Sequence, residues 1–432
     1  MSRILDAVAP PRMGTSFRWL LGSSWVSNIG DGIALAAGPL LVASQTSNAI
    51  LVAMAALLQR VPWLLLGLYA GAIADRVDRR RLVMAANTAR AFVVGVLCVA
   101  LATGRVSIAV VLVAMFLLGV AEVFAVTTTS TLLPMLVEPA DLGVGNARLQ
   151  GSFLVADQIV GPPVGAFLFA IGAVWPFGMQ AVLVGLSVLL VARIATPSGP
   201  VRDIEGTHVL RDIAEGVRWL VHHDAVRTLA IVIVAFNITW GAAWAVLVLY
   251  ALDHLHMDAV GYGLLTTAAA VGGLASTFAY GWIERHVDLT TVMRVCLLLE
   301  VVSHAAFALT TNGFVAMGIM VVFGAYAFVW GAVSTSVRQR ATPKALQGRV
   351  SSVYMVCVFG GLVVGQALGG WIAERWGLTA PFWFAFVGAG ITLVLVWRQL
   401  AYVAHAEAAP DEPVDLPPTD DEPWTGVVDG MP

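Results

Sequence analysis

The sequence predicts an all-α, polytopic membrane protein with about twelve transmembrane helices in two pseudo-symmetric six-helix bundles. Three observations lead to this fold class. Hydrophobic residues make up 59% of the 432-residue chain and charged residues only 12%, about half of the charged fraction usual in soluble domains. The apolar residues lie in long runs, each near the roughly 20 residues that a helix needs to cross a bilayer. The two halves of the chain also carry similar residues at similar intervals.

Each predicted helix is an apolar run that ends at residues which favour turns or water. The charged stretch 75–81 separates the second and third runs, and Gly104 and Arg105 separate the third and fourth. The first run is too long for the apolar segment of a cleavable signal, so we expect it to stay as a helix. The expected spans are 17–43, 46–73, 80–102, 107–135, 144–171, 174–195, 226–250, 259–284, 289–309, 313–337, 349–374 and 379–401.

The longest connection between apolar runs divides the chain in two. It opens with Pro-Ser-Gly-Pro at 197–200 and continues through 209–222, where apolar residues recur at helical spacing and predict an amphipathic helix. After the last run, acidic residues and prolines without Lys or Arg predict a disordered tail. The predicted divisions are a lead 1–16, an N-terminal bundle 17–195, a linker 196–225, a C-terminal bundle 226–403 and an acidic, Pro-rich tail 404–432.

The two bundles share small residues at matching positions. Gly161 matches Gly365 and Gly165 matches Gly369, each pair 204 residues apart. Small residues allow close helix packing in a membrane, so we expect both pairs at helix interfaces. Two parallel repeats allow one half to rock against the other around a central site.

Basic residues are concentrated on one side of the expected topology. With the N-terminus placed in the cytoplasm, the outer loops hold only Arg105 and Arg375, and the spans hold Arg60 and Arg90. All other Lys and Arg residues fall in cytoplasmic segments or at the cytoplasmic ends of spans. Because cytoplasmic loops are enriched in positive charge, we predict that both termini are cytoplasmic.

The sequence carries no pattern typical of an enzyme or a metal protein. Cys98, Cys296 and Cys357 all fall inside expected spans, so they predict neither a disulfide framework nor a thiol metal site. No Gly-x-x-x-x-Gly-Lys-Ser/Thr phosphate loop occurs in the chain. We therefore expect no cofactor, no metal and no nucleic-acid partner.

Five charged residues fall near the middle of spans in the N-terminal bundle. A charge that faces lipid at the bilayer centre costs about 2.5–3.5 kcal/mol, so we expect these side chains to face one another or a water-filled cavity. Two bases cannot neutralise three acids, which leaves one carboxylate to bind and release a proton. Asp31 and Glu122 are the first candidates and Asp157 the third, with a static salt-bridge cluster as the alternative. The five residues are Asp31, Arg60, Arg90, Glu122 and Asp157.

The C-terminal bundle differs, because its expected cavity residues are aromatic or carry amides. Asn237, Trp240 and Trp244 fall on one face of the seventh span by their spacing. An aromatic wall opposite a charged one suits an amphipathic small molecule, either neutral or cationic, since aromatic faces attract cations. Glu300 and His304 form an i, i+4 pair, for which a local hydrogen bond is the favoured interpretation. The cavity residues expected in this half are Asn237, Trp240, Trp244, Tyr326, Trp330 and Gln366.

A short basic stretch between the second and third runs carries the most specific motif. It reads Gly-Ala-Ile-Ala-Asp-Arg-Val-Asp-Arg-Arg-Arg from Gly71 to Arg81. The spacing Gly-x-x-x-Asp-Arg-x-x-Arg-Arg resembles the signature loop between helices 2 and 3 of the major facilitator superfamily of transporters. Asp78 stands where that signature usually has Gly. An ordinary basic loop that only fixes orientation is the alternative.

This resemblance implies that the stretch is a conformational latch. In the outward-facing state, Asp75 is expected at the N-terminal end of the eleventh helix, where the positive end of a helix favours an anion. Arg79 is expected to pair with an acid at the end of the fourth helix, such as Glu138. The latch residues are Gly71, Asp75, Arg76, Arg79, Arg80 and Glu138.

Two further stretches resemble parts of the same superfamily. Gly161-Pro-Pro-Val-Gly165 resembles the Gly-Pro-x-x-Gly motif of antiporters, in which prolines bend the helix at the interface between the halves. Asn28-Ile-Gly-Asp31-Gly, with Asn28 expected in the cavity, is similar to the bacterial exporters of enterobactin and macrolides. The expected interface residues are Gly161, Pro162, Gly165, Gly365 and Gly369.

These resemblances imply an exporter in the inner membrane of a bacterium. It would move an amphipathic small molecule, such as a drug, a siderophore or a related metabolite, outward by alternating access in exchange for protons. The proton motive force would drive this transport, and the protein would act as a monomer in the lipid bilayer. A lipid or lysolipid flippase of the same fold, without proton exchange, is the second hypothesis. A membrane sensor or scaffold that does not transport is the third.

Overall fold

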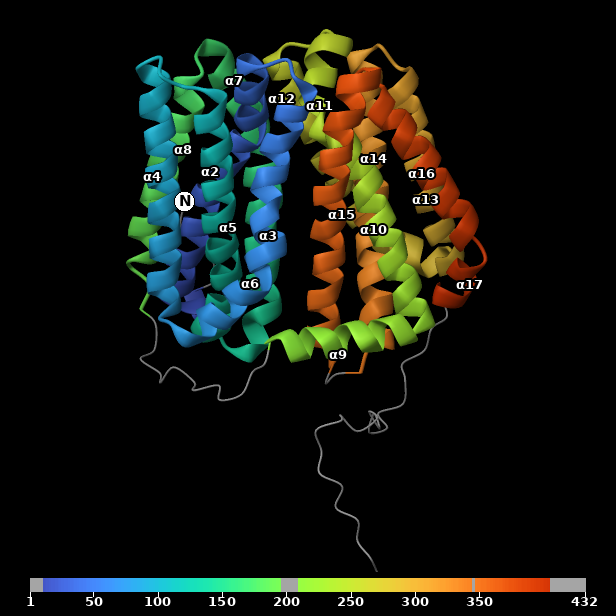
Figure 1. The fold of residues 1–432 in the computed structure, drawn as a ribbon. Helices are drawn as coiled ribbons and strands as arrows, with labels where there is room; N and C mark the ends of the chain where they lie inside the picture. Colours follow the sequence, from blue (N-terminus) through green and yellow to red (C-terminus); the bar gives the residue numbers. More distant parts are fainter. Residues whose placement is uncertain (1–10, 196–208, 344–345, 405–432) are drawn as a thin grey trace, which may run out of the picture.

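The protein folds into two helical bundles that lie side by side (Figure 1). The computed structural model describes residues 11–195, 209–343 and 346–404. The first bundle covers residues 14–191 and the second 224–396, and helix α9 (Val209–His222) crosses one end of the second bundle. No strand occurs in this described part of the chain. The first ten residues of the predicted lead, linker residues 196–208 and the acidic tail from 405 lie outside the described residues.

The N-terminal bundle contains the six predicted spans. Its fifth span consists of three consecutive segments, because a π-helix interrupts the α-helix. The bounds are η1 (Pro11–Met13), α2 (Gly14–Gln45), α3 (Ala49–Arg76), α4 (Arg79–Ala102), α5 (Ile108–Leu136), η2 (Pro139–Asp141), α6 (Leu142–Ser152), η3 (Phe153–Val160), α7 (Gly161–Ile171) and α8 (Val174–Val191).

The C-terminal bundle repeats this arrangement, with its first span broken near its end. Eleven helical segments of the described chain are long and apolar enough to cross a membrane, and a twelfth apolar helix, α16, is shorter. The predicted fold class is therefore confirmed. The bounds are α10 (Asp224–Ala245), α11 (Leu247–Leu249), η4 (Tyr250–His254), α12 (Ala259–His286), α13 (Leu289–Leu309), α14 (Gly313–Ala341), α15 (Gln347–Trp376), α16 (Ala380–Val396) and α17 (Gln399–Ala404).

Many of the long helices begin at a side chain that caps them. An Asn, Asp or Ser oxygen accepts a hydrogen bond from a backbone N–H of the first turn, which has no partner inside the helix. Asp78 caps α4 in this way by accepting from the Arg81 N–H at 2.9 Å. The basic stretch predicted as a turn is therefore mostly helical, with only Val77 and Asp78 between α3 and α4. The capping residues are Asn48, Asp78, Ser107, Asp258, Asp288 and Asn312.

Close packing inside each bundle depends on paired glycines. A Cβ built on Gly161 or Gly165 would collide with the backbone of α2. A Cβ built on Gly365 or Gly369 would collide in the same way with the backbone of α10. Each pair therefore holds its helix against the first helix of its own bundle, so the matching positions have matching structural roles.

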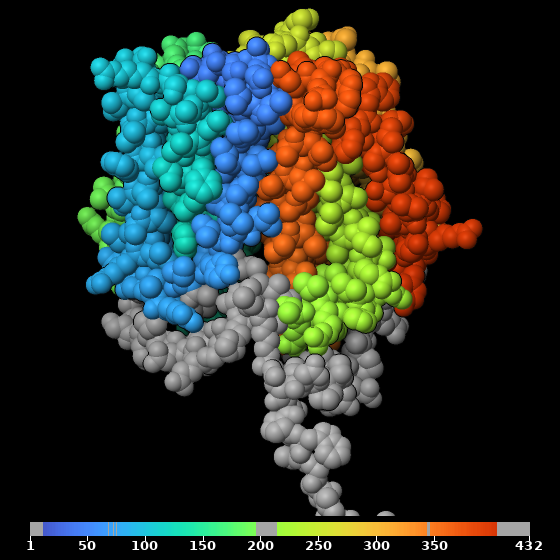
Figure 2. Space-filling model, viewed as in Figure 1, coloured from blue at the N-terminus to red at the C-terminus, as the bar shows by residue number. Residues whose placement is uncertain are grey.

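Two seams join the bundles at the end remote from α9. In one seam α7 packs against α12, where a Cβ built on Gly263 would lie 2.8 Å from the Pro162 carbonyl oxygen. In the other, α3 packs against α15, where a Cβ built on Gly370 would lie 2.5 Å from the Ala53 Cβ. Figure 2 shows α3 and α15 in contact along the front of the molecule. Pro162 thus lies at the interface between the halves, whereas Gly161 packs inside the first bundle.

The hydrophobic core shows at which end the two halves are joined. One cluster of buried side chains contains Leu41 and Val52 of the first bundle together with Val248 and Phe382 of the second. Near α9, each bundle has its own buried clusters, such as the one around Phe17 in the first bundle. The halves therefore share a core at the end remote from α9 and have separate cores at the α9 end.

Helix α9 is held on the second bundle by an ion pair and a ring stack. The Glu215 carboxylate lies 2.7 Å from the guanidinium of Arg349 on α15. Trp219 stacks on His223 with ring centroids 4.8 Å apart, and His223 Nδ1 accepts from the Val226 N–H at 3.4 Å. Burial lowers the pKa of His223, which favours the neutral ring that this cap requires. The helix predicted over 209–222 therefore forms and packs on the second bundle.

A carboxylate also closes the end remote from α9. Glu374, near the end of α15, accepts from the Ala49 N–H at 2.8 Å and from the Asn48 side-chain amide at 3.2 Å, at the start of α3. The first N–H groups of a helix are unpaired and carry partial positive charge, so this carboxylate stabilises the closed contact between the halves. This contact was not predicted from the sequence.

Replacing Gly165 by Ala should destabilise the fold, because the added methyl group would be forced against the α2 backbone. Overpacking a tight contact costs about 1–3 kcal/mol, so the Tm of the purified protein in detergent should fall by several degrees. The matched control is Gly185→Ala in α8, where nothing lies within 4 Å of an added Cβ. That change should keep or slightly raise the Tm. Equal Tm values for the two variants would contradict the close approach of α7 and α2.

Replacing Glu374 by Ala should open the end remote from α9. Hydrogen bonds to a charged group contribute about 1.5–3 kcal/mol, which shifts a two-state equilibrium about ten- to hundredfold. Spin labels at Thr103→Cys and Thr311→Cys, one in each half at this end, should report a larger population of long distances. The matched control is Glu284→Ala, an exposed acid near the α9 end of α12. Unchanged distance distributions in the Glu374 variant would show that the cap does not hold the halves together.

Candidate functional site

A large cavity lies between the two bundles. Its volume is about 870 Å³, within the size range of sites that hold drug-sized molecules. Its lining reaches from Val42 and Val52 near the closed end to Asn146 and Gln150 near the α9 end. The cavity therefore extends from the middle of the spans toward the end at which the halves share no core.

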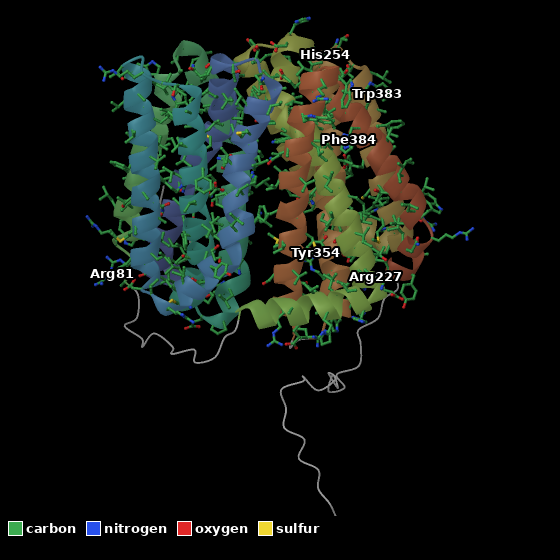
Figure 3. The ribbon with its side chains drawn as sticks, in the orientation of Figure 1. Arg81, Arg227, His254, Tyr354, Trp383 and Phe384 are labelled. Carbon is green, nitrogen blue, oxygen red and sulfur yellow. The ribbon has the colours of Figure 1, made fainter. Side chains whose placement is uncertain are left out.

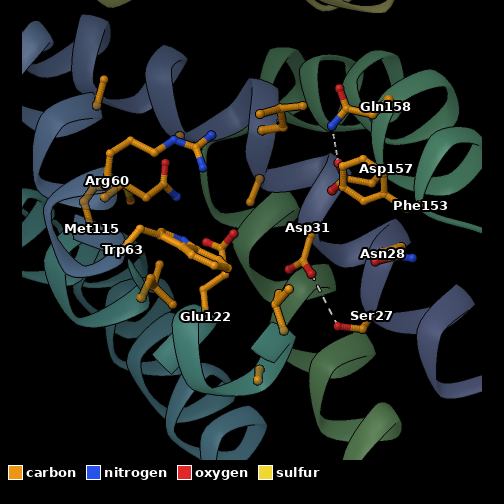
Figure 4. Close-up of a pocket in the computed structure, with 18 of the residues that line it drawn as sticks. Ser27, Asn28, Asp31, Arg60, Trp63, Met115, Glu122, Phe153, Asp157 and Gln158 are labelled. Atoms are coloured by element: carbon orange, nitrogen blue, oxygen red, sulfur yellow. Dashed lines mark hydrogen bonds between the residues drawn. The ribbon is translucent and has the colours of Figure 1, made fainter. Parts of the chain in front are cut away.

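The five charged residues predicted for the middle of the N-terminal bundle all line this cavity. They are the only charged residues among the described residues of its lining, and they come from α2, α3, α4, α5 and η3. Figure 4 shows four of them, Asp31, Arg60, Glu122 and Asp157, around one space. Their convergence follows from the cost of a charge that faces lipid. The five are Asp31, Arg60, Arg90, Glu122 and Asp157.

Asp31 is held in an ion pair with Arg90. The Arg90 guanidinium donates to Asp31 Oδ1 and, at 3.2 Å, to Asn87 Oδ1. Ser27 Oγ donates to Asp31 Oδ2 at 3.3 Å (Figure 4). The Arg90 side chain is 6% exposed and that of Asp31 26%. Arg90 is thus fixed by its neighbours, while Asp31 is neutralised and still faces the cavity.

Glu122 and Asp157 have no ion pair within 4 Å among the described residues. The Arg60 guanidinium acts electrostatically on both carboxylates, and Arg90 also acts on Glu122. Asp157 is 7% exposed, and its carboxylate accepts from the side-chain amide of Gln158. This pairing changes the order of the candidates for the excess carboxylate. Asp31 is ion-paired with Arg90, whereas Glu122 and Asp157 form no ion pair with a described residue.

Asp157 lies in the π-helix η3, which was not predicted. A π-helix has a wider turn than an α-helix and often occurs at functional sites. Here the turn brings the Asp157 backbone against α2, where a Cβ on Gly32 would collide with it, while the side chain lines the cavity. One turn earlier, Ser152 Oγ accepts from the side-chain amide of Asn28, another cavity residue, at 3.1 Å. The π-helix thus lets Asp157 take part in a helix contact and in the cavity.

The C-terminal half supplies a wall of rings and amides. Asn237, Trp240, Trp244 and Gln366 all line the cavity. The two tryptophan rings lie 4.9 Å apart. Gln366 is 3% exposed, and its Oε1 accepts no hydrogen bond from the described residues. An unpaired buried acceptor of this kind is suited to contact a ligand.

Tyr326 and Trp330 do not line the cavity, so their assignment to it is wrong. The Tyr326 hydroxyl donates to Glu300 Oε2 at 2.5 Å, and Trp330 is 3% exposed within the core of the second bundle. The buried carboxylate of Glu300 needs hydrogen-bond donors, and α14 meets this need by turning Tyr326 toward α13. Phe323 of the same helix lines the cavity instead.

Two lining features were missed from the sequence. Trp63 of the first half stacks on Phe359 of the second, with ring centroids 5.2 Å apart and planes 16° from parallel. Gln180 on α8 is 4% exposed and has an unpaired Oε1 among the described residues. The spacing could have found Trp63, because it follows Arg60 by three residues and so lies on the same helix face.

The basic latch residues connect the α3–α4 turn to the ends of two helices. Arg79 Nη1 lies 3.4 Å from the Thr131 carbonyl oxygen near the end of α5, and Arg80 donates to a carbonyl oxygen just after α8. Carbonyl groups at a helix C-terminus carry partial negative charge and favour a cation. Glu138 is exposed. The Asp75 side chain lies outside the described residues, so its latch role and the pairing of Arg79 with Glu138 stay predictions.

The chain is similar to bacterial proteins that are named as pumps and exporters. It is 27% identical over 377 residues to the multidrug efflux pump Tap of Mycolicibacterium fortuitum, which covers 84% of this chain and 90% of that protein. It is 22% identical over 391 residues to the enterobactin exporter EntS of Escherichia coli O1:K1 / APEC, which covers 88% of this chain and 92% of that protein.

The fold and the family are shown by two further comparisons. A structure of a variant of the nucleoside transporter NupG matches with a TM-score of 0.73 at 12% identity, over 90% of this chain and 100% of that one. The family model described as transmembrane secretion effector matches residues 6–421. The chain therefore belongs to the transmembrane secretion effector family of the major facilitator superfamily.

Proposed function

We propose that this protein exports an amphipathic, cationic small molecule across the bacterial inner membrane in exchange for protons. The observation that carries the proposal is the cavity, in which three carboxylates and two guanidinium groups face a wall of aromatic rings. The relatives Tap and EntS are named as an efflux pump and an exporter, which supports the outward direction.

The distribution of charge supports a cytoplasmic position for the α9 end. Arg81 and Arg227 lie at this end and His254 at the other (Figure 3). Lys and Arg are enriched on the cytoplasmic side of membrane proteins. With this orientation both termini are cytoplasmic, and the closed end held by Glu374 faces outward. The structure is then inward-facing, with the cavity reaching toward the compartment from which an exporter takes its substrate.

The chemistry of the cavity favours a cation with an apolar body. Its charged residues sum to one excess negative charge when all are ionised. Trp63, Trp240 and Trp244 offer aromatic faces, which attract cations by about 0.5–2 kcal/mol each. Gln180 and Gln366 add amide oxygens that have no partner among the described residues and can accept a hydrogen bond from a ligand. A lipophilic cation with N–H groups would satisfy all three kinds of lining residue.

Proton exchange follows from competition for the same carboxylates. A cation that enters the inward-facing cavity favours ionised Glu122 and Asp157, so their protons leave toward the cytoplasm. In the outward-facing state, a lower external pH returns the protons and weakens the hold on the cation. One proton that crosses about 100 mV and one pH unit supplies about 2.3 and 1.4 kcal/mol, enough to accumulate a neutral substrate a few hundredfold. Export of a monovalent cation costs about 2.3 kcal/mol against the same potential, so one-for-one exchange accumulates the cation about tenfold, driven by the pH difference.

Uptake into inverted membrane vesicles with an acidic interior tests the proposal. Four probes separate the substrate classes: tetraphenylphosphonium, a macrolide, a siderophore and a lysolipid. We expect tetraphenylphosphonium to accumulate, and we expect accumulation to stop when nigericin collapses the pH gradient. Movement of the lysolipid alone, at the same rate with and without the gradient, would contradict the proposal and favour a passive flippase.

Replacing Glu122 by Gln and Asp157 by Asn together should uncouple transport from the pH gradient. Without either carboxylate, gradient-driven accumulation of tetraphenylphosphonium should fall at least about tenfold, while downhill movement of the probe continues. The matched control is Glu284→Gln, which removes an exposed acid near the α9 end of α12. The coupling scheme is wrong if the double variant still concentrates the probe as the wild type does.

Replacing Trp63 by Leu should weaken binding of cations more than binding of neutral molecules. Loss of one cation–π contact of about 0.5–2 kcal/mol raises the KM for tetraphenylphosphonium about two- to thirtyfold. A neutral probe of similar shape should show a smaller change. The matched control is Trp175→Leu, a tryptophan 62% exposed and outside the cavity lining. Equal changes in KM for the charged and neutral probes would show that Trp63 does not bind the cation through its aromatic face.

A further inference from the structure

A buried acid and a buried base lie in the C-terminal bundle, outside the cavity and unused by the scheme above. Glu300 and His304 on α13 are each 1% exposed. His304 Nε2 lies 2.8 Å from Glu300 Oε1, and the Tyr326 hydroxyl donates to Oε2 at 2.5 Å. His304 Nδ1 is the only ring nitrogen or carboxylate oxygen of this pair without a hydrogen-bond partner among the described residues.

We infer that Glu300 and His304 form a second proton-binding site behind the cavity wall, and that this site releases its proton when a cation binds in the cavity. The inference rests on the proposed function, which is the exchange of a cation for protons. It replaces the interpretation of the pair as a local hydrogen bond alone. Three features of the structure support the inference: the hydrogen bonds of the pair, the lack of another cation near it among the described residues, and the aromatic rings that link it to the cavity.

The contacts let the pair gain or lose one proton without moving its heavy atoms. With a neutral imidazole, Nε2–H donates to the Glu300 carboxylate, and the pair carries one negative charge. Adding a proton at Nδ1 gives an imidazolium beside the carboxylate, with the same Nε2–Oε1 contact and no net charge. The unpartnered Nδ1 is thus the atom at which the proton binds, and both states keep the hydrogen bond from Tyr326.

The described residues around Glu300 offer no charge other than His304 to neutralise it. The helices that pack most extensively against α13 are α14, α16 and α17, and from α10 the uncharged ring of Trp240 faces His304. From α14 the facing titratable group is Tyr326, and α16 contains no titratable residue. On α13 itself Cys296 lies one turn away, and on α17 Tyr402 is exposed. No Lys or Arg of the described chain forms an ion pair with Glu300, so His304 is its source of positive charge.

Two aromatic rings separate the pair from the cavity. Trp240 and Phe323 both line the cavity and stack with ring centroids 3.6 Å apart. The Trp240 centroid lies 6.2 Å from that of His304, and Phe323 meets Tyr326 edge-on at 5.4 Å. A cation on the cavity side of Trp240 and an imidazolium behind it repel each other and compete for the same ring. Binding of the cation therefore favours loss of the His304 proton, which is the coupling that an antiporter needs.

Proton release from the purified full chain in detergent tests this inference. The protein is kept in weakly buffered solution with a pH indicator, and tetraphenylphosphonium is added to saturation. We expect His304→Gln to release about one proton fewer per bound cation than the wild type. The matched control is Thr290→Val, a buried polar residue of the same helix, which should release as many protons as the wild type.

The outcomes distinguish this site from the proposed function. If the wild type binds the cation and releases no proton, proton exchange itself fails, and this inference fails with it. If the wild type releases protons and His304→Gln releases the same number, only the second site is overturned, and the pair is a packing contact.

A second measurement covers the case in which His304→Gln does not fold. Protonated imidazole quenches a nearby indole, so the fluorescence difference between the wild type and Trp240→Phe should show a step on pH titration. Saturating tetraphenylphosphonium should shift this step to lower pH, because the bound cation disfavours the imidazolium. A difference that is flat across the pH range, or a step that the cation leaves in place, would overturn the inference.

Discussion

The cost of a charge in the bilayer interior is the constraint on which this structure depends. Four helices and the π-helix η3 of the N-terminal bundle each carry one charged side chain near mid-span, and each must turn that side chain away from lipid. Because all five side chains must avoid lipid, each helix is oriented about its own axis so that its charge faces the same central space. The charged side chains therefore both line the cavity and help to determine where it forms. Loss of Asp31 or of Arg90 would leave the other member of their ion pair without its counter-charge.

The two halves share their packing and differ in their chemistry. Equivalent glycines hold α7 against α2 and α15 against α10, so the backbone frame repeats. On this common frame the N-terminal half places its charges in the cavity. The C-terminal half presents rings there and keeps its Glu300–His304 pair behind them. A frame that repeats allows the halves to move as similar rigid bodies, while unlike linings let one half bind protons and the other bind the apolar body of a substrate.

The sequence predicted what depends on helix length and on the sign of charges. Apolar runs gave the twelve spans, and mid-span charges gave the membership of the cavity, because burial of charge leaves few alternatives. Which charged side chain pairs with which was less predictable from the sequence. Arg90 pairs with Asp31, and Arg60 acts on Glu122 and Asp157. These pairings depend on how each helix is rotated about its axis, which the order of residues in the sequence does not show. The Trp63–Phe359 stack joins residues of different halves, and no local spacing relates them.

The error at Tyr326 shows how one buried acid changes a neighbouring helix. Tyr326 and Trp330 were expected in the cavity because both are aromatic and lie within the tenth span. The Glu300 carboxylate is 1% exposed and needs a donor other than His304. When α14 turns Tyr326 toward it, Phe323 moves to the cavity side and stacks on Trp240. A hydrogen bond outside the cavity thus determines which ring a substrate meets. For the same reason the proton state of that pair and the occupancy of the cavity are physically connected.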